Sequence, residues 1–552
     1  MSSDDVKALG GDLEKAHSIM DQEFVTEKGN GTITEDKQDG QMQRHLKPRH
    51  MSMIAIGGTI GTGLFIGSGQ GLNQGGPVGL LLGYSTMGIV VYSVMVSLGE
   101  MVTMFPITGS FVHYASRFVD PALGFALGWN YWYCYAITLP TEITAAGIVI
   151  QYWTKSVNVA VWITIFLVAS CGVNLFGVRW YGEAEFWCSA VKVIAIVCLI
   201  ILGIIIDLGG GPNHDRIGFR YWISPGPFNQ LNGIPGSTGR FLAFWSVFIQ
   251  ASFSYQGTEI VALAAGEALN PRKTIPKAIN RVFYRILLFY VGGVTVIGLL
   301  VPYNSPDLLG GTGDATSSPF VIAIKSAGIS VLPDVLNAVI LAVVFSAANS
   351  DLYAASRMTF GLATDGMAPA IFSRCTSNGL PIAGLILTIG FGLLAYMNVN
   401  SSTGTVFQWL ANFSSVTGLL TWWSISLAYI RFYHGLIHHK IDRNTFAYKA
   451  PYQPWLSYFS ITMSTLIIFF NGFEVFMSGS WSTSKFVSAY LSIPMFIVFF
   501  ITWKIYHKTA FVKIDQMDFV TGKREFDSME QIESEKEVEP VGKFAQFLEW
   551  LM

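Results

Sequence analysis

Long apolar runs alternate with short polar connections over most of this chain. Runs of roughly 18 or more apolar residues are long enough to cross a bilayer as helices. We count twelve of them, at approximately 51–72, 77–104, 121–153, 159–177, 185–206, 241–266, 283–303, 331–355, 380–398, 406–430, 455–478 and 485–507. The pattern therefore predicts an all-α polytopic membrane protein with 12 transmembrane helices.

Basic residues between the runs indicate which side of the membrane each connection faces. Cytoplasmic connections of membrane proteins are enriched in Lys and Arg. Such residues precede the first run (Arg44, Lys47 and Arg49) and follow the sixth (Arg272, Lys273, Lys277, Arg281 and Arg285). The connections 69–76 and 399–405, assigned to the outer side, contain neither. We therefore expect a polar cytoplasmic tail at 1–45, a transmembrane domain at 46–508 and a second cytoplasmic tail at 509–552, with both polar tails disordered.

Composition agrees with a membrane protein and argues against several other classes. Hydrophobic residues make up 51% of the chain and charged residues only 13%, whereas soluble domains carry about 25% charged residues. The net charge of −2 gives no basic surface for a nucleic acid. We find no metal-like pair among the five cysteines, no G-x-S-x-G elbow and no P-loop. We therefore expect no metal, no cofactor and no enzymatic activity.

Glycines interrupt the first apolar run. Residues 51–69 read MSMIAIGGTIGTGLFIGSG, and each glycine weakens a helix interior by roughly 1 kcal/mol relative to alanine. Non-helical backbone at membrane depth is tolerated where it lines a cavity or is buried in protein. The run therefore predicts a broken helix built around a site, and close helix packing through the glycines is the alternative.

Polar residues interrupt the sixth run. Its middle, from Ser252 to Glu259, reads SFSYQGTE, and a carboxylate at mid-membrane usually faces a cavity or a partner. The first and sixth runs hold matching positions in two five-helix halves. A pair of interrupted segments in corresponding halves is typical of a transporter with its site at the bilayer midplane.

Seven stretches carry a resemblance to a known family. They are LKPRHMSMIAIGGTIGTGLFIGSG (46–69), SLGEMVTMFPITGSFVHYASRFVDPALGFALGWNYW (97–132), GGGPNHDRIGFRYW (209–222), SYQGTEIVALAAGEALNPRKTIPKAI (254–279), SPFVIAIKSAG (318–328), FSAANSDLYAASR (345–357) and GLPIAGLILT (379–388). With them the chain resembles the fungal amino acid permeases of the amino acid–polyamine–organocation superfamily. The resemblance implies a LeuT-like core of five plus five inverted-repeat helices, with helices one and six discontinuous and two further helices. It also implies proton-driven amino acid uptake across the plasma membrane.

An amino acid substrate brings one carboxylate and one ammonium group to such a site. The unwound first helix would offer backbone N–H groups to the carboxylate, and Gly61, Thr62 and Gly63 are the candidates. Free carbonyls around Ile56 and from Ser254 to Tyr255 would accept from the ammonium. The neighbouring Thr258 completes the predicted substrate-binding set.

The resemblance adds a lid and three ionisable residues. Phe253 resembles the aromatic lid that superfamily members place over the substrate, with a core-facing or lipid-facing ring as the alternative. Glu142, Lys192 and Glu259 are the predicted proton-coupling residues. Burial can shift the pKa of such groups by several units. Static ion pairs or structural hydrogen bonds are the alternative for each of the three.

The predicted function is proton–amino acid symport by alternating access, with a broad range of neutral and basic L-amino acids. Glu142 and Glu259 would favour such substrates. The stretches 209–222 and NSDLY (349–353) also look like those of the acidic amino acid permeases, so a dicarboxylic permease is one alternative. A non-transporting sensor of the same fold is another. The expected partners are the amino acid, the proton, the lipid bilayer and ubiquitin ligase machinery acting on tail lysines, namely Lys7, Lys15, Lys28 and Lys37.

Overall fold

Helical segments are found in each of the twelve predicted apolar runs, as far as the computed structural model describes them. The structure describes residues 60–106, 109–175, 178–263, 271–309, 318–376, 379–399 and 403–521, which are mostly helical and contain no strand within those ranges. They belong to one unit of the chain, 40–552. The predicted tail 1–45 and most of the tail 509–552 lie outside the described residues, as does Ile56.

The longer described helices are, in chain order, η1 (Gly63–Gly67), α3 (Ser68–Met104), α4 (Ser110–Phe118), α5 (Pro121–Ile150), α6 (Val159–Leu175), α7 (Val178–Asp207), α9 (Gly236–Tyr255), α11 (Pro271–Arg285), η4 (Ile286–Gly292), α12 (Gly293–Leu300), α14 (Pro319–Ser326), α15 (Leu332–Thr364), α16 (Ile382–Gly392), η7 (Leu393–Val399), α17 (Thr403–His438), α18 (Trp455–Phe470), α19 (Thr483–Tyr490) and α20 (Ser492–His507). Short segments are α8 (Arg220–Ile223), η2 (Leu231–Gly233), α10 (Ile260–Leu263), α13 (Pro306–Leu309), η6 (Ala370–Ser373), η8 (Arg443–Thr445), η9 (Phe473–Phe476) and η10 (Ile514–Gln516). Among the described residues, 6 helices are long and apolar enough to cross a membrane, or 7 if α19 and α20, bent by 43°, form one span. The number of crossings therefore stays a prediction.

The outer connection assigned to 69–76 is not an irregular loop, because helix α3 includes these residues. A sharp break follows at Gly76, whose φ of 72° favours glycine over residues with a side chain. The chain folds back there. A Cβ placed on Gly71 would lie 2.9 Å from Cδ1 of Leu80, nine residues further along. A straight helix would separate these two residues by about 13 Å, so α3 consists of two arms that lie against each other.

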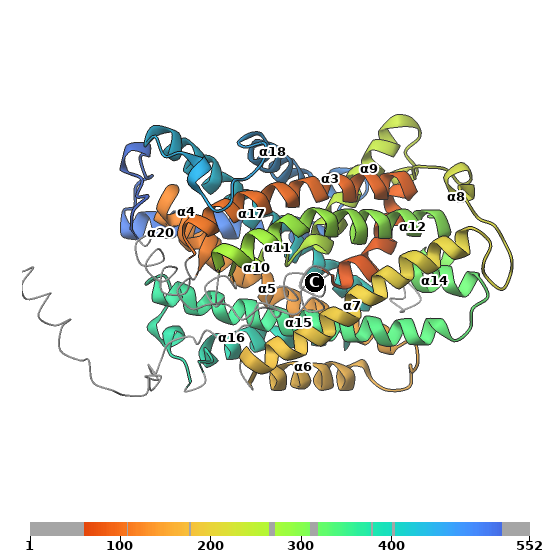
Figure 1. Cartoon of the computed structure of the whole chain (residues 1–552). Helices are drawn as coiled ribbons and strands as arrows, with labels where there is room; N and C mark the ends of the chain where they lie inside the picture. Colours follow the sequence, from red (N-terminus) through yellow and green to blue (C-terminus); the bar gives the residue numbers. More distant parts are fainter. Residues whose placement is uncertain are drawn as a thin grey trace, which may run out of the picture. The chain divides into compact units, whose positions relative to one another are not determined.

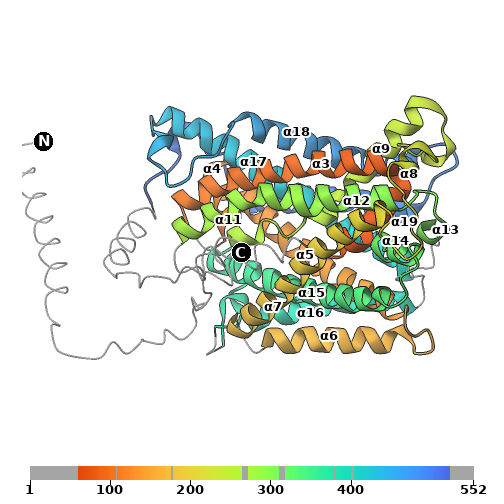
Figure 2. The same cartoon turned by 45° about the vertical axis from the view of Figure 1, so that its right-hand side comes forward.

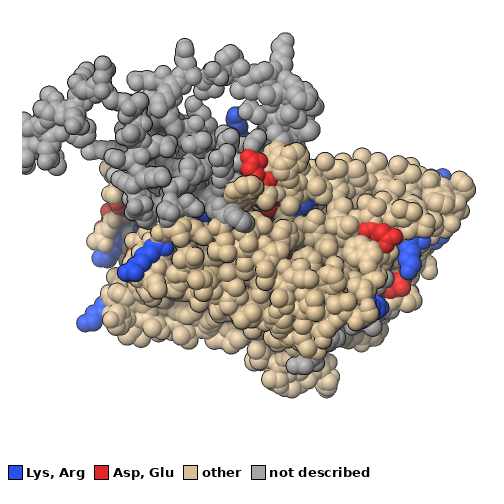
Figure 3. Space-filling model, turned by 90° about the horizontal axis from the view of Figure 1, so that it is seen from below, with Lys and Arg blue, Asp and Glu red and all other residues tan. Residues whose placement is uncertain are grey.

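Helix α5 lies at the centre of the helix assembly and α7 at its edge. The most apolar stretch of α5 is 94% buried, against 33% for α7. Helix α5 packs against α15 and α17, while α3 packs against α9 (Figures 1 and 2). Helices α6 and α7 present exposed apolar side chains such as Val168 and Ile194. The lower middle of the face in Figure 3 shows no charged side chain, which is the surface that a bilayer requires.

A buried ion pair holds the end of α3 that lies away from Gly76. Both carboxylate oxygens of Glu100 accept from Arg443, at 2.6 and 2.7 Å. Glu100 also accepts from the Tyr429 hydroxyl at 2.7 Å and from the Ala450 amide at 2.9 Å. Glu100 itself is fully buried, and four hydrogen bonds satisfy its charge. The pair therefore ties α3 to α17 and to the segment that follows α17.

The chain beyond α20 is anchored to α4 and α5. Arg117 donates to the backbone carbonyls of Asp518 and Thr521, at 2.7 and 3.0 Å. Partial burial acts to raise the pKa of the Asp518 carboxyl, but hydrogen bonds from Thr521 and Val520 outweigh it and lower the pKa to about 2. Asp120 caps α5 and accepts from Lys504. These contacts fix one end of the helix assembly around α4.

Candidate functional site

The sixth apolar run is broken in the structure, as its polar residues predict. Helix α9 ends at Tyr255 and α10 begins at Ile260. Between them Gly257 has a φ of 90°, a conformation that side-chain-bearing residues rarely adopt. Gln256 holds the break against α17, because its Nε2 donates to the Ser414 carbonyl at 2.5 Å and its Oε1 accepts from the Ser414 hydroxyl at 2.7 Å.

The described part of the first run also begins outside a helix. Ile60 and Gly61 are non-helical, and the helix that continues into α3 starts at Thr62. Thr62 makes no side-chain capping hydrogen bond to this helix. Its hydroxyl donates instead to Oε1 of Glu142 on α5, at 2.6 Å. The first-turn N–H groups are thus left without a side-chain cap at the point where α5 approaches.

The two glycines at this helix start have different surroundings. A Cβ on Gly63 would lie 2.4 Å from Cα and 2.8 Å from N of Ser254, so the two interrupted segments touch backbone to backbone there. A Cβ on Gly61 would meet nothing within 4 Å. Close packing therefore explains Gly63, and open space lies beside Gly61.

That open space is a cavity of about 40 Å³ between the two interrupted segments. Its lining residues come from η1, α5, α15 and the α9–α10 break: Gly61, Thr62, Gly63, Tyr135, Thr138, Glu142, Phe253, Ser254, Gln256, Gly257, Ile260, Ala347, Ser350 and Asp351. A single water needs about 10–15 Å³ measured in this way. The cavity therefore holds a few waters, and an amino acid requires the lining side chains to move outward.

Six of the predicted site residues line this cavity: Gly61, Thr62, Gly63, Glu142, Phe253 and Ser254. Phe253 is 6% exposed and meets Phe407 edge to face, with ring centroids 5.9 Å apart. A lid at this position would have to pivot against the Phe407 ring. The role of each of the six in binding stays a prediction.

Tyr255 and Thr258 are not among the lining residues. The Tyr255 hydroxyl donates to the Tyr84 carbonyl at 3.0 Å, and its ring stacks on Tyr290 with centroids 4.1 Å apart. Thr258 donates to the Tyr255 carbonyl at 2.7 Å, and Tyr290 donates to the Ser254 carbonyl at 3.1 Å. The carbonyls predicted to receive the ammonium group therefore already accept hydrogen bonds within the protein. These contacts stabilise the turn of the α9–α10 break.

Glu259 also lies behind the cavity rather than in its lining. Its carboxylate accepts from the Tyr135 hydroxyl at 2.9 Å and from Nε1 of Trp422 at 3.1 Å. These two donors belong to α5 and α17. Glu259 therefore bridges the α9–α10 break to two neighbouring helices, which is the geometry of a positioning group.

Lys192 lies on α7, outside the cavity lining, in a cluster with Glu185. Its Nζ is 3.5 Å from Oε1 of Glu185, and both residues are almost fully buried. Glu185 also accepts from Ser189 at 3.0 Å and from Ser346 of α15 at 2.6 Å. The charge of Lys192 acts electrostatically on Glu142 and Asp351. Lys192 can therefore influence both carboxylates of the cavity without touching a substrate.

The site hypothesis omitted several lining residues, and Asp351 is the most consequential. Its Oδ2 is buried and has no hydrogen-bond partner within the described residues, and the same holds for Oε2 of Glu142. A buried oxygen without a partner costs about 1–3 kcal/mol or more, so both oxygens are available to a donor in the cavity. The sequence feature that could have identified Asp351 is its position as a carboxylate deep in the eighth apolar run, within NSDLY.

Comparison with known proteins places the chain in a family. The family model described as amino acid permease matches residues 50–516. The dicarboxylic amino acid permease of Saccharomyces cerevisiae is 44% identical over 520 residues, which cover 93% of this chain and 84% of that protein. The lysine-specific permease of the same yeast is 44% identical over 527 residues, 95% of this chain and 85% of that protein.

A solved structure of Mhp1, a nucleobase-cation-symport-1 family transporter with bromovinylhydantoin bound, matches with a TM-score of 0.46 and 13% sequence identity. The match covers 83% of this chain and 99% of that one. The family match rests on the sequence comparisons. The chain belongs to the amino acid permease family, as the sequence stretches predict. It is a multi-pass membrane protein of a transporter family.

Proposed function

We propose that this protein is a proton-coupled symporter that imports neutral and basic L-amino acids across the plasma membrane by alternating access. The observation that carries the proposal is the cavity between the two interrupted segments, which joins an uncapped helix start to two unpaired carboxylate oxygens. A helix start without a side-chain cap suits a carboxylate, and the carboxylates suit an ammonium group. The cavity thus offers complementary charge to both ends of an amino acid.

The substrate would lie with its carboxylate at Gly61, Thr62 and Gly63. Phe253 would cover it from α9. Glu142 and Asp351 face the same cavity from α5 and α15. Asp351 would receive the ammonium group or a cationic side chain, while Glu142 would exchange the proton. The described lining contains these two carboxylates and neither Lys nor Arg. An acidic side chain would therefore meet charges of its own sign at short range, where the low dielectric strengthens repulsion.

The proton would be carried by Glu142. This carboxylate lines the cavity and accepts from Thr62 at the helix start that binds substrate. Protonation at Glu142 and substrate binding would therefore affect each other directly. Lys192 would tune Glu142 through its charge, while Glu259 would position the α9–α10 break. This coupling is reciprocal: a bound proton would change the affinity for the substrate by the same factor as bound substrate changes the affinity for the proton.

The orientation follows from the distribution of basic residues. Both tails, 1–45 and 509–552, would lie in the cytoplasm, with the transmembrane domain from 46 to 508. The tail lysines would then be accessible to ubiquitin ligase machinery. On this orientation, the end of α3 near Gly76 faces outward and the Glu100–Arg443 pair faces the cytoplasm.

The dicarboxylic alternative draws on the stretches 209–222 and 349–353 and on the dicarboxylic relative, but the lysine-specific relative is equally similar. Overall identity therefore does not separate the two substrate classes. The charges in the cavity favour the basic and neutral class. A non-transporting sensor would bind the same substrates without flux.

The test is uptake of tritiated L-lysine by a yeast strain that lacks its own permeases, with unlabelled L-lysine, L-alanine and L-glutamate as competitors. We expect lysine and alanine to compete and glutamate to be ineffective. In Asp351→Asn, one anionic partner is lost, so the preference for lysine over alanine should fall roughly tenfold, equivalent to about 1.4 kcal/mol.

Effective competition by glutamate would favour the dicarboxylic alternative, and absence of uptake with normal surface expression would favour a sensor. Asp307→Asn is the matched control, because Asp307 is exposed and remote from the cavity lining. An unchanged preference in Asp351→Asn would remove Asp351 from the site.

A further inference from the structure

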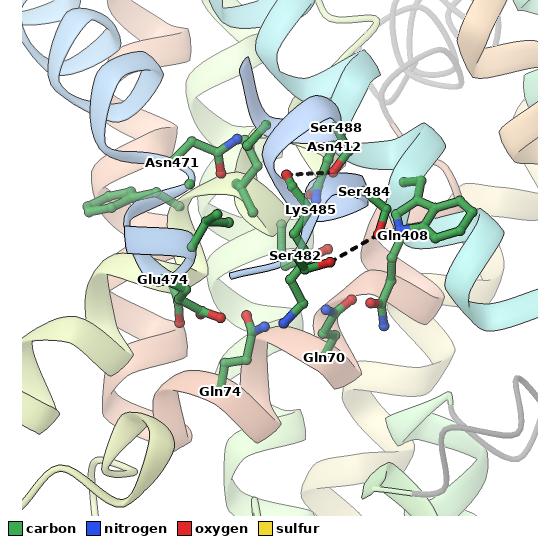
Figure 4. A pocket seen from close by; sticks show the side chains of 18 of the residues that line it. Gln70, Gln74, Gln408, Asn412, Asn471, Glu474, Ser482, Ser484, Lys485 and Ser488 are labelled. Atoms are coloured by element: carbon green, nitrogen blue, oxygen red, sulfur yellow. Dashed lines mark hydrogen bonds between the residues drawn. The ribbon is translucent and has the colours of Figure 1, made fainter. Parts of the chain in front are cut away.

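A second and larger cavity, of about 320 Å³, lies next to the first along the same two helices (Figure 4). Its walls come from α3, α9, α17, α18, α19 and the connection between α18 and α19. Amide side chains from several of these elements line it, including Gln70, Gln74, Gln250 and Asn471. We call it the amide-lined pocket. Its volume falls in the range of about 300–1,000 Å³ that is usual for small-molecule sites.

The amide-lined pocket holds one charge of each sign. Glu474 and Lys485 both line it, and in Figure 4 the Lys485 side chain extends toward the Gln74 amide. Over the part of the chain that the structure describes, neither charge has an ion-pair partner. Both are therefore available to a ligand that carries an anionic and a cationic group.

Two buried amide atoms in the lining also lack partners. Oε1 of Gln74, an acceptor, and Nδ2 of Asn471, a donor, make no hydrogen bond within the described residues. Leaving such atoms unsatisfied costs about 1–3 kcal/mol each. A ligand with both a donor and an acceptor group recovers this energy. The free hydrogen-bonding atoms and the two charges of the pocket therefore suit the same kind of ligand, one with both an ammonium and a carboxylate group.

Aromatic side chains supply the apolar part of the wall. Trp245 and Phe248 of α9 and Trp409 of α17 line the pocket beside the amides. Apolar walls with a few convergent polar groups are typical of sites for small organic molecules. An amino acid fits this arrangement of charged and aromatic walls. Its ammonium and carboxylate groups would contact the two charged side chains, and its own side chain would contact the aromatic rings.

The two cavities share structural elements. The Ser254 hydroxyl, at the first cavity, donates to the carbonyl of Gln250, which lines the second. Gln70 lies seven residues beyond Gly63, or about 10 Å along the helix. A molecule in the amide-lined pocket is thus about two helical turns from the proposed transport site and in contact with both of its half-helices.

We propose that the amide-lined pocket is a second binding site for a free amino acid, which occupies it before entering the transport cavity. Lys485 would take the carboxylate and Glu474 the ammonium group, with Gln74 and Asn471 completing the contacts. The proposal rests on the proposed function and on the orientation that places this end of α3 outside. A zwitterionic lipid headgroup has the same pair of charges, so the experiment must separate the two sources.

The test is equilibrium binding of tritiated L-lysine to the purified full-length protein in nanodiscs of phosphatidylglycerol, a lipid without an ammonium group. We expect two bound molecules per chain for the native protein. Lys485→Met and Glu474→Gln should each leave one. Gly61→Leu should also leave one, because its side chain enters the open space of the transport cavity. Lys325→Met, at an exposed lysine of α14, should leave two, and thermal melting checks that each variant is folded.

Several outcomes would overturn the second site. One is that the native protein binds a single lysine, that Gly61→Leu abolishes this binding and that Lys485→Met leaves it intact. The proposed function would survive this result. Another is loss of the Lys485-dependent lysine when zwitterionic phosphatidylethanolamine replaces phosphatidylglycerol, which would assign the pocket to a lipid headgroup. Conversely, one lysine that depends on Lys485 and Glu474 in a protein without uptake would support the pocket and contradict the transport proposal.

Discussion

Gly63→Ala is expected to abolish amino acid uptake. The new methyl group would lie 2.4 Å from Cα of Ser254, and neither backbone can move aside by changing a rotamer. Overpacking commonly costs about 1–3 kcal/mol and occasionally more, and a contact this short belongs at the upper end. The two interrupted segments would be forced apart. Uptake of tritiated lysine, normalised to surface expression, measures the effect.

Gly61→Ala is the matched control, since it adds the same methyl group two residues earlier. Nothing lies within 4 Å of its Cβ position, so the variant should fold and reach the surface with native stability, whereas Gly63→Ala should be destabilised. Equal and full activity of both variants would contradict the contact between Gly63 and Ser254. Thermal melting in detergent separates loss of folding from loss of transport.

Glu142→Gln is expected to abolish proton-driven accumulation while leaving exchange of substrate across the membrane. Glutamine keeps the shape of the side chain and an oxygen to accept from Thr62, but it cannot take up or release a proton at this position. Without the proton, the internal substrate concentration can only equal the external one. Accumulation under an imposed pH gradient and exchange between equal concentrations are measured in the same vesicles.

Glu259→Gln provides the comparison, because it is the same change at a buried carboxylate outside the cavity lining. Its amide oxygen can still accept from Trp422, and its amide nitrogen can donate to the Tyr135 hydroxyl oxygen. We expect accumulation to persist in this variant. Loss of accumulation in Glu259→Gln with retention in Glu142→Gln would move the proton to Glu259.

The sequence located the two interruptions because glycine and clustered polar residues are costly inside an apolar helix. Gly61 and Ser254 reach the cavity as expected. The pattern could not tell which side chains at the α9–α10 break face it, because the positive φ of Gly257 removes helical periodicity. Tyr255 and Glu259 accordingly turn toward neighbouring helices and Thr258 turns back onto the Tyr255 carbonyl, while Gln256 lines the cavity.

Residues from distant helices were harder to place. Asp351 joins Glu142 at the cavity only through the packing of α15 against α5, a contact that no local pattern encodes. The reversal between the first two runs was expected, but its confinement to the single residue Gly76 was not. Its glycine-rich approach reads as a loop, yet helix α3 runs up to it and the chain turns at a single residue.

Family membership sets the class of substrate, and the cavity must set the choice within it. A dicarboxylic and a lysine-specific relative are equally similar to this chain. Glu142 and Asp351 are the candidates in the described lining, and their charge predicts exclusion of acidic amino acids.

The most direct test of the transport cavity is lysine accumulation by the purified protein in liposomes under an inward proton gradient. The native protein should concentrate tritiated L-lysine above the external level and lose it when a protonophore collapses the gradient. Gly61→Leu, which fills the space between the interrupted segments, should bind no lysine there and transport none. Uptake by Gly61→Leu at the native rate, or native accumulation that ignores the protonophore, would contradict the account.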